Sequence, residues 1–256
     1  MGTKSYWKSG KLNFWDSQIN TTFKTGVWAD CPLLAMQCDP TVAYEFFEDW
    51  VNFKGTASAT TLTGWTLTQA STGAVSISDT QAGGILLLDS NSITEAQGAQ
   101  IQYTTGTLPF IPAATKDIWF ECKLKIVDTY DKCELFAGLS AVDTSIIAGS
   151  DMTAANHIGF ECHTDDGVIL FGGEKAGAEA TPVTSNTIAD DTYVRLGFKV
   201  NGVTSVSHYV DGVLIGTSIL TANIPIVGIT PSFVCQSGGT NDPIMHLDWV
   251  RIVQLR

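Results

Sequence analysis

The chain of 256 residues is long enough for one large β domain, and a second full domain is not expected. Hydrophobic residues make up 44% of it and charged residues only 16%, so Thr, Ser, Asn, Gln and Gly must cover much of the surface. The formal net charge of −12 argues against direct nucleic-acid binding, because phosphate contacts need clustered Lys and Arg.

The first 54 residues are rich in aromatic side chains and show little strand periodicity. No apolar stretch follows the charged residues at the start, so neither an export signal nor a membrane helix is expected, and synthesis in the cytoplasm is predicted. So many aromatic side chains need something to cover them. Either the segment folds back over the β domain as its first strand and an edge cover, or it forms an extended arm that docks on a neighbouring subunit.

If the segment is an arm, its aromatic side chains are the expected interface anchors, because such side chains dominate interface cores. The anchors would be Trp7, Phe14, Trp15, Phe23 and Trp28. Further along, residues 45–53 are predicted to be a strand. Asp39-Pro40 would also suit the start of a helix with one apolar face, which is the alternative for this stretch.

From residue 64 onward, short β-patterned runs follow one another with Gly, Asn and Asp between them. The dipeptides Asn201-Gly202 and Asp211-Gly212 are typical of tight hairpins. Regular spacing of this kind predicts an antiparallel sandwich or jelly roll. Strands are expected at residues 64–68, 73–78, 84–89, 99–105, 117–127, 133–141, 157–163, 168–172, 193–200, 208–210, 213–217, 229–235 and 245–255.

Two stretches carry a resemblance to a known family. The run YVRLGFKVNGVTSVSHYVDGVLIGT, from Tyr193 to Thr217, and the run HLDWVRIV, from His246 to Val253, resemble parts of concanavalin A-like (laminin-G-like) jelly rolls, which include lectins and glucanases. The resemblance covers roughly residues 55 to 256. It implies an all-β, concanavalin A-like jelly-roll β-sandwich at 55–256, preceded by an aromatic-rich N-terminal arm and first strand at 1–54.

The six cysteines show none of the close pairs that mark zinc or redox sites. Cys122, Cys162 and Cys235 lie within predicted strands, where a free thiol behaves as a small hydrophobic side chain, and they are expected to be buried and reduced. Cys31 and Cys38 flank a Pro-Leu-Leu loop and would pair only in an oxidising compartment.

A search for catalytic residues finds no motif. A glucanase of this fold would carry a Glu-x-Asp-x-x-Glu run on one strand, with carboxylates about 5–5.5 Å apart in a retaining enzyme. No such run exists, the histidines are scattered, and no metal or other cofactor is expected. We therefore predict that the protein is not an enzyme. The enzymatic alternative needs carboxylates brought together from separate strands, with Glu121, Glu134 and Glu161 as candidates whose faces alternation alone does not assign.

The run that starts at Trp119 and the C-terminal LDWVRIVQLR also resemble jelly-roll proteins that tailed bacteriophages encode among their head genes. This resemblance implies a non-enzymatic viral structural protein, a capsid decoration (cement) protein on the outside of the phage head. Its partners would be the major capsid protein and copies of itself in a homotrimer. It would be found in the virion, on the capsid surface, after synthesis in the host cytoplasm.

The alternative function is a carbohydrate-binding, lectin-like module on a phage tail or a cell surface. Sugars hydrogen-bond to Asn, Asp and Gly-rich loops, and the candidate loops are residues 91–97, 172–180 and 236–242. The last of these contains the candidate sugar-binding residues Gly238, Thr240, Asn241 and Asp242. Neither interpretation involves a nucleic acid or a membrane.

Overall fold

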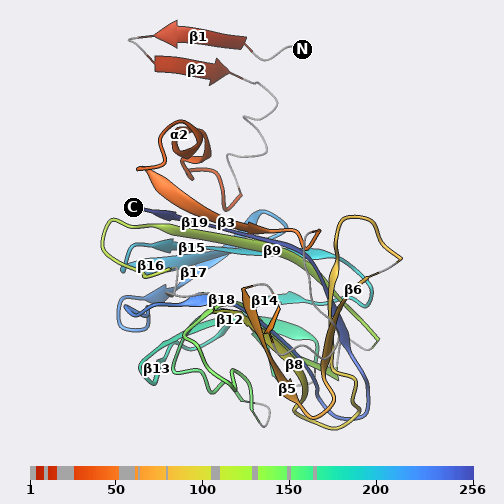
Figure 1. Ribbon diagram of the computed structural model, residues 1–256. Coiled ribbons are helices and arrows are strands. Elements are labelled where there is room, and N and C mark those ends of the chain that lie inside the picture. The colour runs from red at the N-terminus through yellow and green to blue at the C-terminus, as the bar shows by residue number, and fades with distance from the viewer. Residues whose placement is uncertain are drawn as a thin grey trace.

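Two antiparallel sheets pack face to face as a sandwich (Figure 1). The protein is described by a computed structural model that covers residues 4–8, 11–15, 26–51, 61–62, 64–78, 80–104, 110–128, 132–148, 151–163 and 166–256. We name the two layers sheet I and sheet II. The all-β sandwich predicted from the sequence is confirmed.

Sheet I contains nine of the described strands. In order across the sheet they are β13 (Ala178–Glu179), β12 (Val168–Lys175), β11 (Asn156–Cys162), β10 (Cys133–Ser140), β18 (Thr230–Ser237), β8 (Gln97–Tyr103), β5 (Trp65–Ala70) and β4 (Thr61–Leu62), and β14 (Val183–Thr187) also pairs with β12. Strands β10, β11 and β12 follow one another in the chain and are neighbours in the sheet. The long connection between β10 and β11 therefore begins and ends on adjacent strands of sheet I.

Sheet II contains eight described strands. In order they are β17 (Val213–Leu220), β16 (Ser205–Val210), β15 (Val194–Asn201), β9 (Ile118–Val127), β19 (Ile244–Leu255), β7 (Leu86–Asp89) and β6 (Ala74–Ile77), and β3 (Ala43–Glu48) pairs with the second half of β19. The C-terminal strand is therefore central in this sheet, with β9 along one side and β3 and β7 sharing the other.

Segment 26–42 covers part of the outer face of sheet II. It contains the helix α2 (Leu33–Cys38), and its side chains Val27 and Met36 pack against Trp119 and Val253 of the sheet. Figure 1 shows α2 above β3 and β19, on the side of sheet II away from sheet I. Strands β1 (Lys4–Lys8) and β2 (Lys11–Trp15) pair with each other in a separate two-stranded sheet.

The interior between the sheets is built from alternating inward residues, as the sequence pattern predicts. The large side chains Trp65, Phe120, Phe198 and Phe233 are fully buried there. Cys122, Cys162 and Cys235 are buried, as predicted, and so is Cys133; none of the four forms a disulfide within the described chain. Cys31 and Cys38 are likewise unpaired.

The predicted strands from residue 64 onward are confirmed, with ends that shift by one to three residues. Asp211 and Gly212 both have positive φ (49° and 79°), the geometry of a type I′ hairpin turn. The strand expected at 45–53 begins at Ala43 and ends at Glu48, because the chain turns at Trp50, whose φ is 60°. The helical alternative for this stretch is wrong, and the short elements α2, β13 and β14 were not predicted.

Candidate functional site

The two central strands of sheet I are buried on both faces. Every residue of β10 and β18 is buried, including those whose side chains point away from sheet II. Something must therefore cover the outer face of this sheet. The cover is the connection between β10 and β11, residues 141–155, which is several times longer than the two to five residues of an ordinary hairpin loop. We call its described residues, 141–148 and 151–155, the cover segment.

An apolar contact holds the cover segment on the sheet. Phe136 of β10 and Val234 of β18 point outward and pack against Ile146, Ile147 and Ala154 of the cover, and all five are at most 1% exposed. The segment also folds on itself, since the N–H of residue 153 donates to the carbonyl of residue 146 (2.8 Å). The cover is thus a packed element rather than a loop in solvent.

Two buried glutamines of β8 hold the cover through its backbone. The Gln100 amide donates to the carbonyl of Asp143 (2.6 Å) and accepts from the N–H of Ile146 (2.9 Å). The Gln102 amide accepts from the N–H of Asp143 (2.9 Å) and donates to the carbonyl of Ala141 (3.1 Å). These bonds satisfy backbone groups that the cover would otherwise bury without partners.

A small polar pocket of about 160 Å³ lies between the cover segment and the outer faces of β5, β8 and β18. Its polar lining consists of amides and hydroxyls, from Thr68, Gln69, Gln100, Thr144, Ser145 and Gln236. Gln236 is only 6% exposed, and its side-chain oxygen accepts no hydrogen bond from the described part of the chain. A buried acceptor without a donor is costly, so this oxygen is a candidate for ligand contact.

Two carboxyl groups lie on the same outer face as this pocket. In the β10–β18 register Glu134 lies directly opposite Gln236, and in the β10–β11 register Glu161 lies directly opposite Phe136. Glu134 and Phe136 are two residues apart on one strand, so both carboxyls share the face. Both are 0% exposed. The Glu161 side chain extends over Gly172 of β12, where an added Cβ would lie 2.6 Å from Oε1.

Glu161 is a buried acid without a hydrogen bond among the described residues. Burial raises its pKa to about 8, and the negative charges of Glu179, Asp151 and Glu174 add to this rise. Nε2 of His157 lies 3.7 Å from Oε2 of Glu161. At neutral pH the closed site therefore holds Glu161 in its protonated form.

His157 links the carboxyl site to the cover segment. Its Nδ1 lies 2.7 Å from the carbonyl of Ala154, so Nδ1 carries the proton and donates, and Nε2 is left as an acceptor facing Glu161. Burial lowers the pKa of His157, which keeps the ring neutral. The neutral imidazole of His157 thus faces the protonated carboxyl group of Glu161.

The third candidate carboxylate lies elsewhere. Glu121 is on the outer face of sheet II, where its Oε2 accepts a hydrogen bond from the indole N–H of Trp28 (2.6 Å). Burial raises its pKa, while this hydrogen bond and the cations Arg195 and Arg251 oppose the rise. Of the three carboxylates named from the sequence, the structure places Glu134 and Glu161 on one face of two adjacent strands and Glu121 on the other sheet.

The loop predicted to bind sugar follows β18 and contains Gly238, Thr240, Asn241 and Asp242. It packs against the loop after β7, since the N–H of Thr240 donates to the carbonyl of Ile93 (2.9 Å). Asp242 Oδ1 accepts from the hydroxyl of Ser90 (2.6 Å) and from the N–H of Ser92 (3.0 Å). These contacts give Asp242 a structural role, and the polar pocket is built from other residues.

The predicted arm anchors are in different settings. The backbone of Trp7 lies in β1 and that of Phe14 and Trp15 in β2, whereas Phe23 lies outside the described residues. Trp28 is half-buried against sheet II. Its ring also lies under the guanidinium of an arginine of β19, 5.1 Å from the ring centre. Trp28 is thus a contact within the sandwich.

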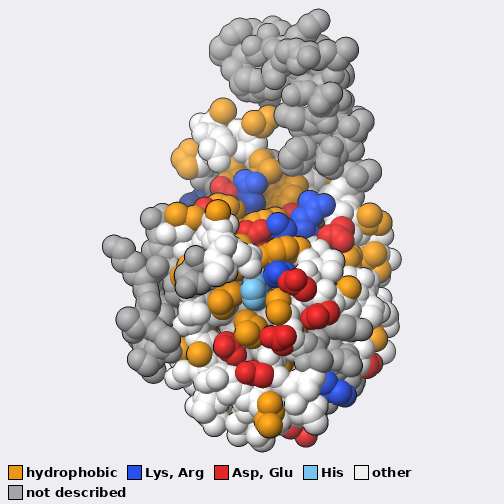
Figure 2. Space-filling model, turned by 90° about the vertical axis from the view of Figure 1, so that its right-hand side faces the viewer, with side chains coloured by type: hydrophobic (Ala, Val, Ile, Leu, Met, Phe, Trp, Pro, Cys, Tyr) orange, Lys and Arg blue, Asp and Glu red, His pale blue; other side chains and the backbone are white. Residues whose placement is uncertain are grey.

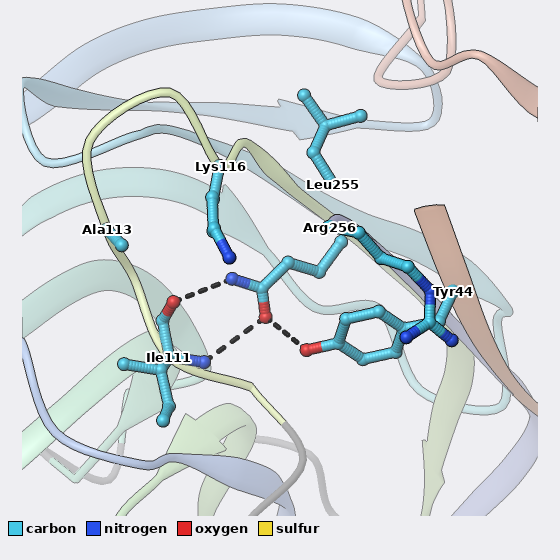
Figure 3. Close-up of a pocket in the computed structure, with 7 residues that line it drawn as sticks. Tyr44, Ile111, Ala113, Lys116, Leu255 and Arg256 are labelled. Carbon is cyan, nitrogen blue, oxygen red and sulfur yellow. Dashed lines mark hydrogen bonds between the residues drawn. The ribbon is translucent and has the colours of Figure 1, made fainter. Parts of the chain in front are cut away.

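A second pocket, of about 350 Å³, lies where β3 meets the end of β19 (Figure 3). Its central group is the amide of Gln254, which accepts from the Tyr44 hydroxyl (2.5 Å) and from the N–H of Ile111 (3.2 Å). The same amide donates to the carbonyl of Ile111 (2.6 Å). Lys116 and Arg256 complete the wall. Because both the oxygen and the nitrogen of this amide are hydrogen-bonded, Gln254 holds three segments of the chain together.

Within the described ranges, no group of three or more His, Cys, Asp or Glu side chains is placed to hold a metal ion. On the face drawn in Figure 2, acidic side chains gather below a few Lys and Arg side chains, and the basic ones form no continuous area. None of the helices in the described part of the chain is long and apolar enough to cross a membrane.

Comparison with solved structures identifies the fold. No family model and no curated protein matches the sequence. A protein of unknown function from Shewanella oneidensis MR-1 has a TM-score of 0.59 at 14% identity over 88% of this chain and 94% of its own. The endo-1,3-beta-glucanase of Streptomyces sioyaensis (0.56, 14%, 84% and 98%) and peanut lectin (0.53, 12%, 84% and 98%) are also similar. The protein thus has a concanavalin A-like jelly-roll fold, as the resemblance implied.

The comparisons contradict the prediction that the chain is not an enzyme. Four further glucanase structures, among them that of Bacillus licheniformis, have TM-scores of 0.53 to 0.57. The prediction rested on the missing single-strand motif, yet the structure places Glu134 and Glu161 on one face from two strands. At these low identities the likeness shows the shared fold, and hydrolysis becomes a candidate function.

Sequence reasoning named Gln236 only as the first residue of the candidate loop 236–242, and it missed the cover segment and the two glutamines of β8. One signal was available: the predicted strands 133–141 and 157–163 pair as neighbours, yet 15 residues separate them. A gap of that length is too long for a hairpin turn and marks a loop with a role of its own.

Proposed function

We propose that the protein binds a carbohydrate on the outer face of sheet I, in the polar pocket between β5, β8, β18 and the cover segment. Gln236 carries this proposal: a nearly buried amide oxygen that lines the pocket and lacks a donor within the described chain. A sugar hydroxyl would supply that donor. The lectin and glucanases that share the fold support this class of ligand.

The pocket lining favours an uncharged sugar. Its polar groups are neutral hydroxyls and amides, each able to donate or accept, and its volume of about 160 Å³ is below the roughly 300–1,000 Å³ of pockets that enclose drug-sized ligands. In the closed form it therefore suits one sugar unit of a chain rather than a long segment. No charged side chain lines it.

The test is a glycan array followed by titration of the binding sugars against two variants. Gln236→Leu removes the pocket acceptor, and Asn241→Ala changes the loop predicted from the sequence. We expect Gln236→Leu to weaken binding at least about tenfold, since a lost buried hydrogen bond corresponds to roughly 1–3 kcal/mol. Loss of binding in Asn241→Ala with full binding in Gln236→Leu would move the site to the loop. No binding of any glycan would refute the proposal.

Glycoside hydrolysis is the second candidate, favoured by Glu161. A carboxyl group that stays protonated at neutral pH suits the role of general acid, and Glu134 lies on the neighbouring strand of the same face. We expect release of reducing ends from a β-glucan, lost by at least about a hundredfold in Glu161→Gln and in Glu134→Gln. Activity that survives both substitutions would exclude this pair.

The capsid-decoration function, with the major capsid protein and a homotrimer as partners, stays a prediction. The aromatic N-terminal segment is the feature that supports it. Quantitative mass spectrometry of virions measures it directly: a copy number equal to, or a simple fraction of, that of the major shell protein is expected. A few copies per particle would indicate a tail or fibre location, and absence from the particle would exclude a virion protein.

A further inference from the structure

The polar pocket has a recessed floor beside Gln236. In the strand registers Gln236 of β18 lies opposite Gly98 of β8, and Gly98 lies opposite Ala70 of β5. The position next to Gln236 therefore carries no side chain, and the one beyond it carries only a methyl group. Gly98 is also required by packing, because an added Cβ would overlap the carbonyl oxygen of Cys235. The space beside the Gln236 amide is thus built into the sheet.

The pocket presents chemical groups of three kinds. The first is the side-chain oxygen of Gln236, an acceptor without a donor in the described chain. The second is the pair of hydroxyl groups of Thr68 and Thr144, each of which is able to donate a hydrogen bond. The third is a set of apolar side chains that end in methyl groups, and they are Ala70, Ala96, Ile147 and Ala148.

An acetamido group matches all three kinds. Its N–H donates one hydrogen bond, its carbonyl oxygen accepts one from a threonine hydroxyl, and its methyl group suits an apolar wall. A plain sugar hydroxyl also donates to the Gln236 oxygen, but it leaves the apolar side chains without an apolar partner. An ammonium group or a carboxylate would find no side chain of opposite charge, since no charged residue lines the pocket.

We propose that the sugar bound in this pocket is an N-acetylated amino sugar, whose acetamido N–H donates to Oε1 of Gln236 and whose methyl group packs towards Ala70. The proposal rests on the proposed function, because it names the class of sugar for that same pocket. Strands β18 and β5 are roughly 10 Å apart across β8. That distance accommodates a hydrogen bond of about 2.9 Å, the acetamido group and an apolar contact of about 4 Å.

Sugars that differ only at C2 test the proposal. The probes are the methyl glycosides of N-acetylglucosamine, glucose and glucosamine, and of N-acetylgalactosamine, galactose and galactosamine, titrated by NMR. In at least one set, the acetamido sugar should bind at least about tenfold more tightly than the hydroxyl and amino sugars. Equal or tighter binding of those parents, or binding of other glycans but of neither acetamido sugar, would overturn this inference while the proposed function stands. Binding of no glycan would overturn both.

An ester probe tests the hydrogen bond to Gln236. The 2-O-acetyl ester of the same sugar keeps the carbonyl and methyl groups but has no N–H. The wild type should bind this ester at least about tenfold more weakly than the acetamido sugar, and Gln236→Leu should bind the two alike. The matched control Asn241→Ala, which removes an amide side chain that does not line the pocket, should keep the wild-type preference. Equal binding of ester and amide by the wild type, or a preference that survives in Gln236→Leu, would overturn the proposal.

Discussion

Glu121 and Glu161 are both buried glutamates, one on the outer face of each sheet, but their surroundings differ. Glu121 accepts a 2.6 Å hydrogen bond from Trp28 and has Arg195 and Arg251 near it. Glu161 has no hydrogen bond among the described residues, and the charges that shift its pKa are all negative. The comparison shows one buried carboxyl group with a hydrogen-bond donor and another without a donor among the described residues.

This difference indicates a structural role for Glu121 and a functional role for Glu161. A polar group that is buried and paired adds to the specificity and rigidity of its surroundings, whereas one buried without a partner lowers stability. Such a cost is commonly retained at functional sites. Segment 26–42 therefore fits a structural part of the sandwich, and the cover segment of sheet I fits a part of the binding site.

The largest expected change in the free energy of unfolding comes from weakening the contact between the cover segment and sheet I. Phe136 is fully buried and is the main apolar contact between β10 and the cover. Replacing it with Ala should lower the free energy of unfolding by about 3–5 kcal/mol through lost burial and the cavity left behind. Denaturant unfolding measures this loss. A change below about 1 kcal/mol would mean that the cover contributes little to the folded state.

The second effect is the pH dependence that distinguishes the two glutamates. The folded-state pKa of Glu161 is about 8 and its ordinary value is 4.5, so the folded protein binds the extra proton between these values. Stability should therefore fall as pH rises from 4.5 towards 8, by up to about 1.4 kcal/mol per unit.

Chemical unfolding of the wild type, Glu161→Gln and Glu121→Gln at pH 5 and pH 7 measures the second effect. Glu161→Gln should be more stable than the wild type at pH 7, with a smaller fall between the two pH values. Glu121→Gln should be less stable, because it loses the charged acceptor of Trp28. Equal slopes in all three proteins would show that the two carboxyls do not differ in the way the structure indicates.

The sequence predicts the local features of these two sites but not the contacts that depend on tertiary packing. Strand positions, the buried cysteines and the Asp211-Gly212 hairpin follow from local alternation and turn chemistry, and they were predicted. The shared face of Glu134 and Glu161 was not assigned, because it depends on strand register across β10 and β11, which alternation within one strand does not define. The partner of Glu121 lies 93 residues away in the chain. Such contacts are set by tertiary packing alone.

The third prediction concerns Glu121, the carboxyl group that accepts a hydrogen bond from Trp28. Trp28→Phe keeps an aromatic ring next to Arg251 but removes the indole N–H that donates to Glu121. A buried carboxylate that loses a charge-assisted hydrogen bond should cost about 2 kcal/mol of stability and raise the pKa of Glu121 further. Denaturant unfolding and carboxyl titration by NMR measure both quantities. In the double variant Trp28→Phe/Glu121→Gln, the cost of losing Trp28 should be smaller, because the charge that needed the donor is gone.

The smallest effect concerns the polar attachment of the cover. Gln102→Ala removes hydrogen bonds to the backbone of Asp143 and Ala141, but the gap it leaves is next to the polar pocket, where water is able to replace the amide. The free energy of unfolding should fall by only about 1 kcal/mol, and exchange of the Asp143 N–H should accelerate more than that of amides in β10. Equal acceleration in β10 and the cover would mean that the cover does not open on its own, and that the two faces of the sandwich are stabilised as a single unit.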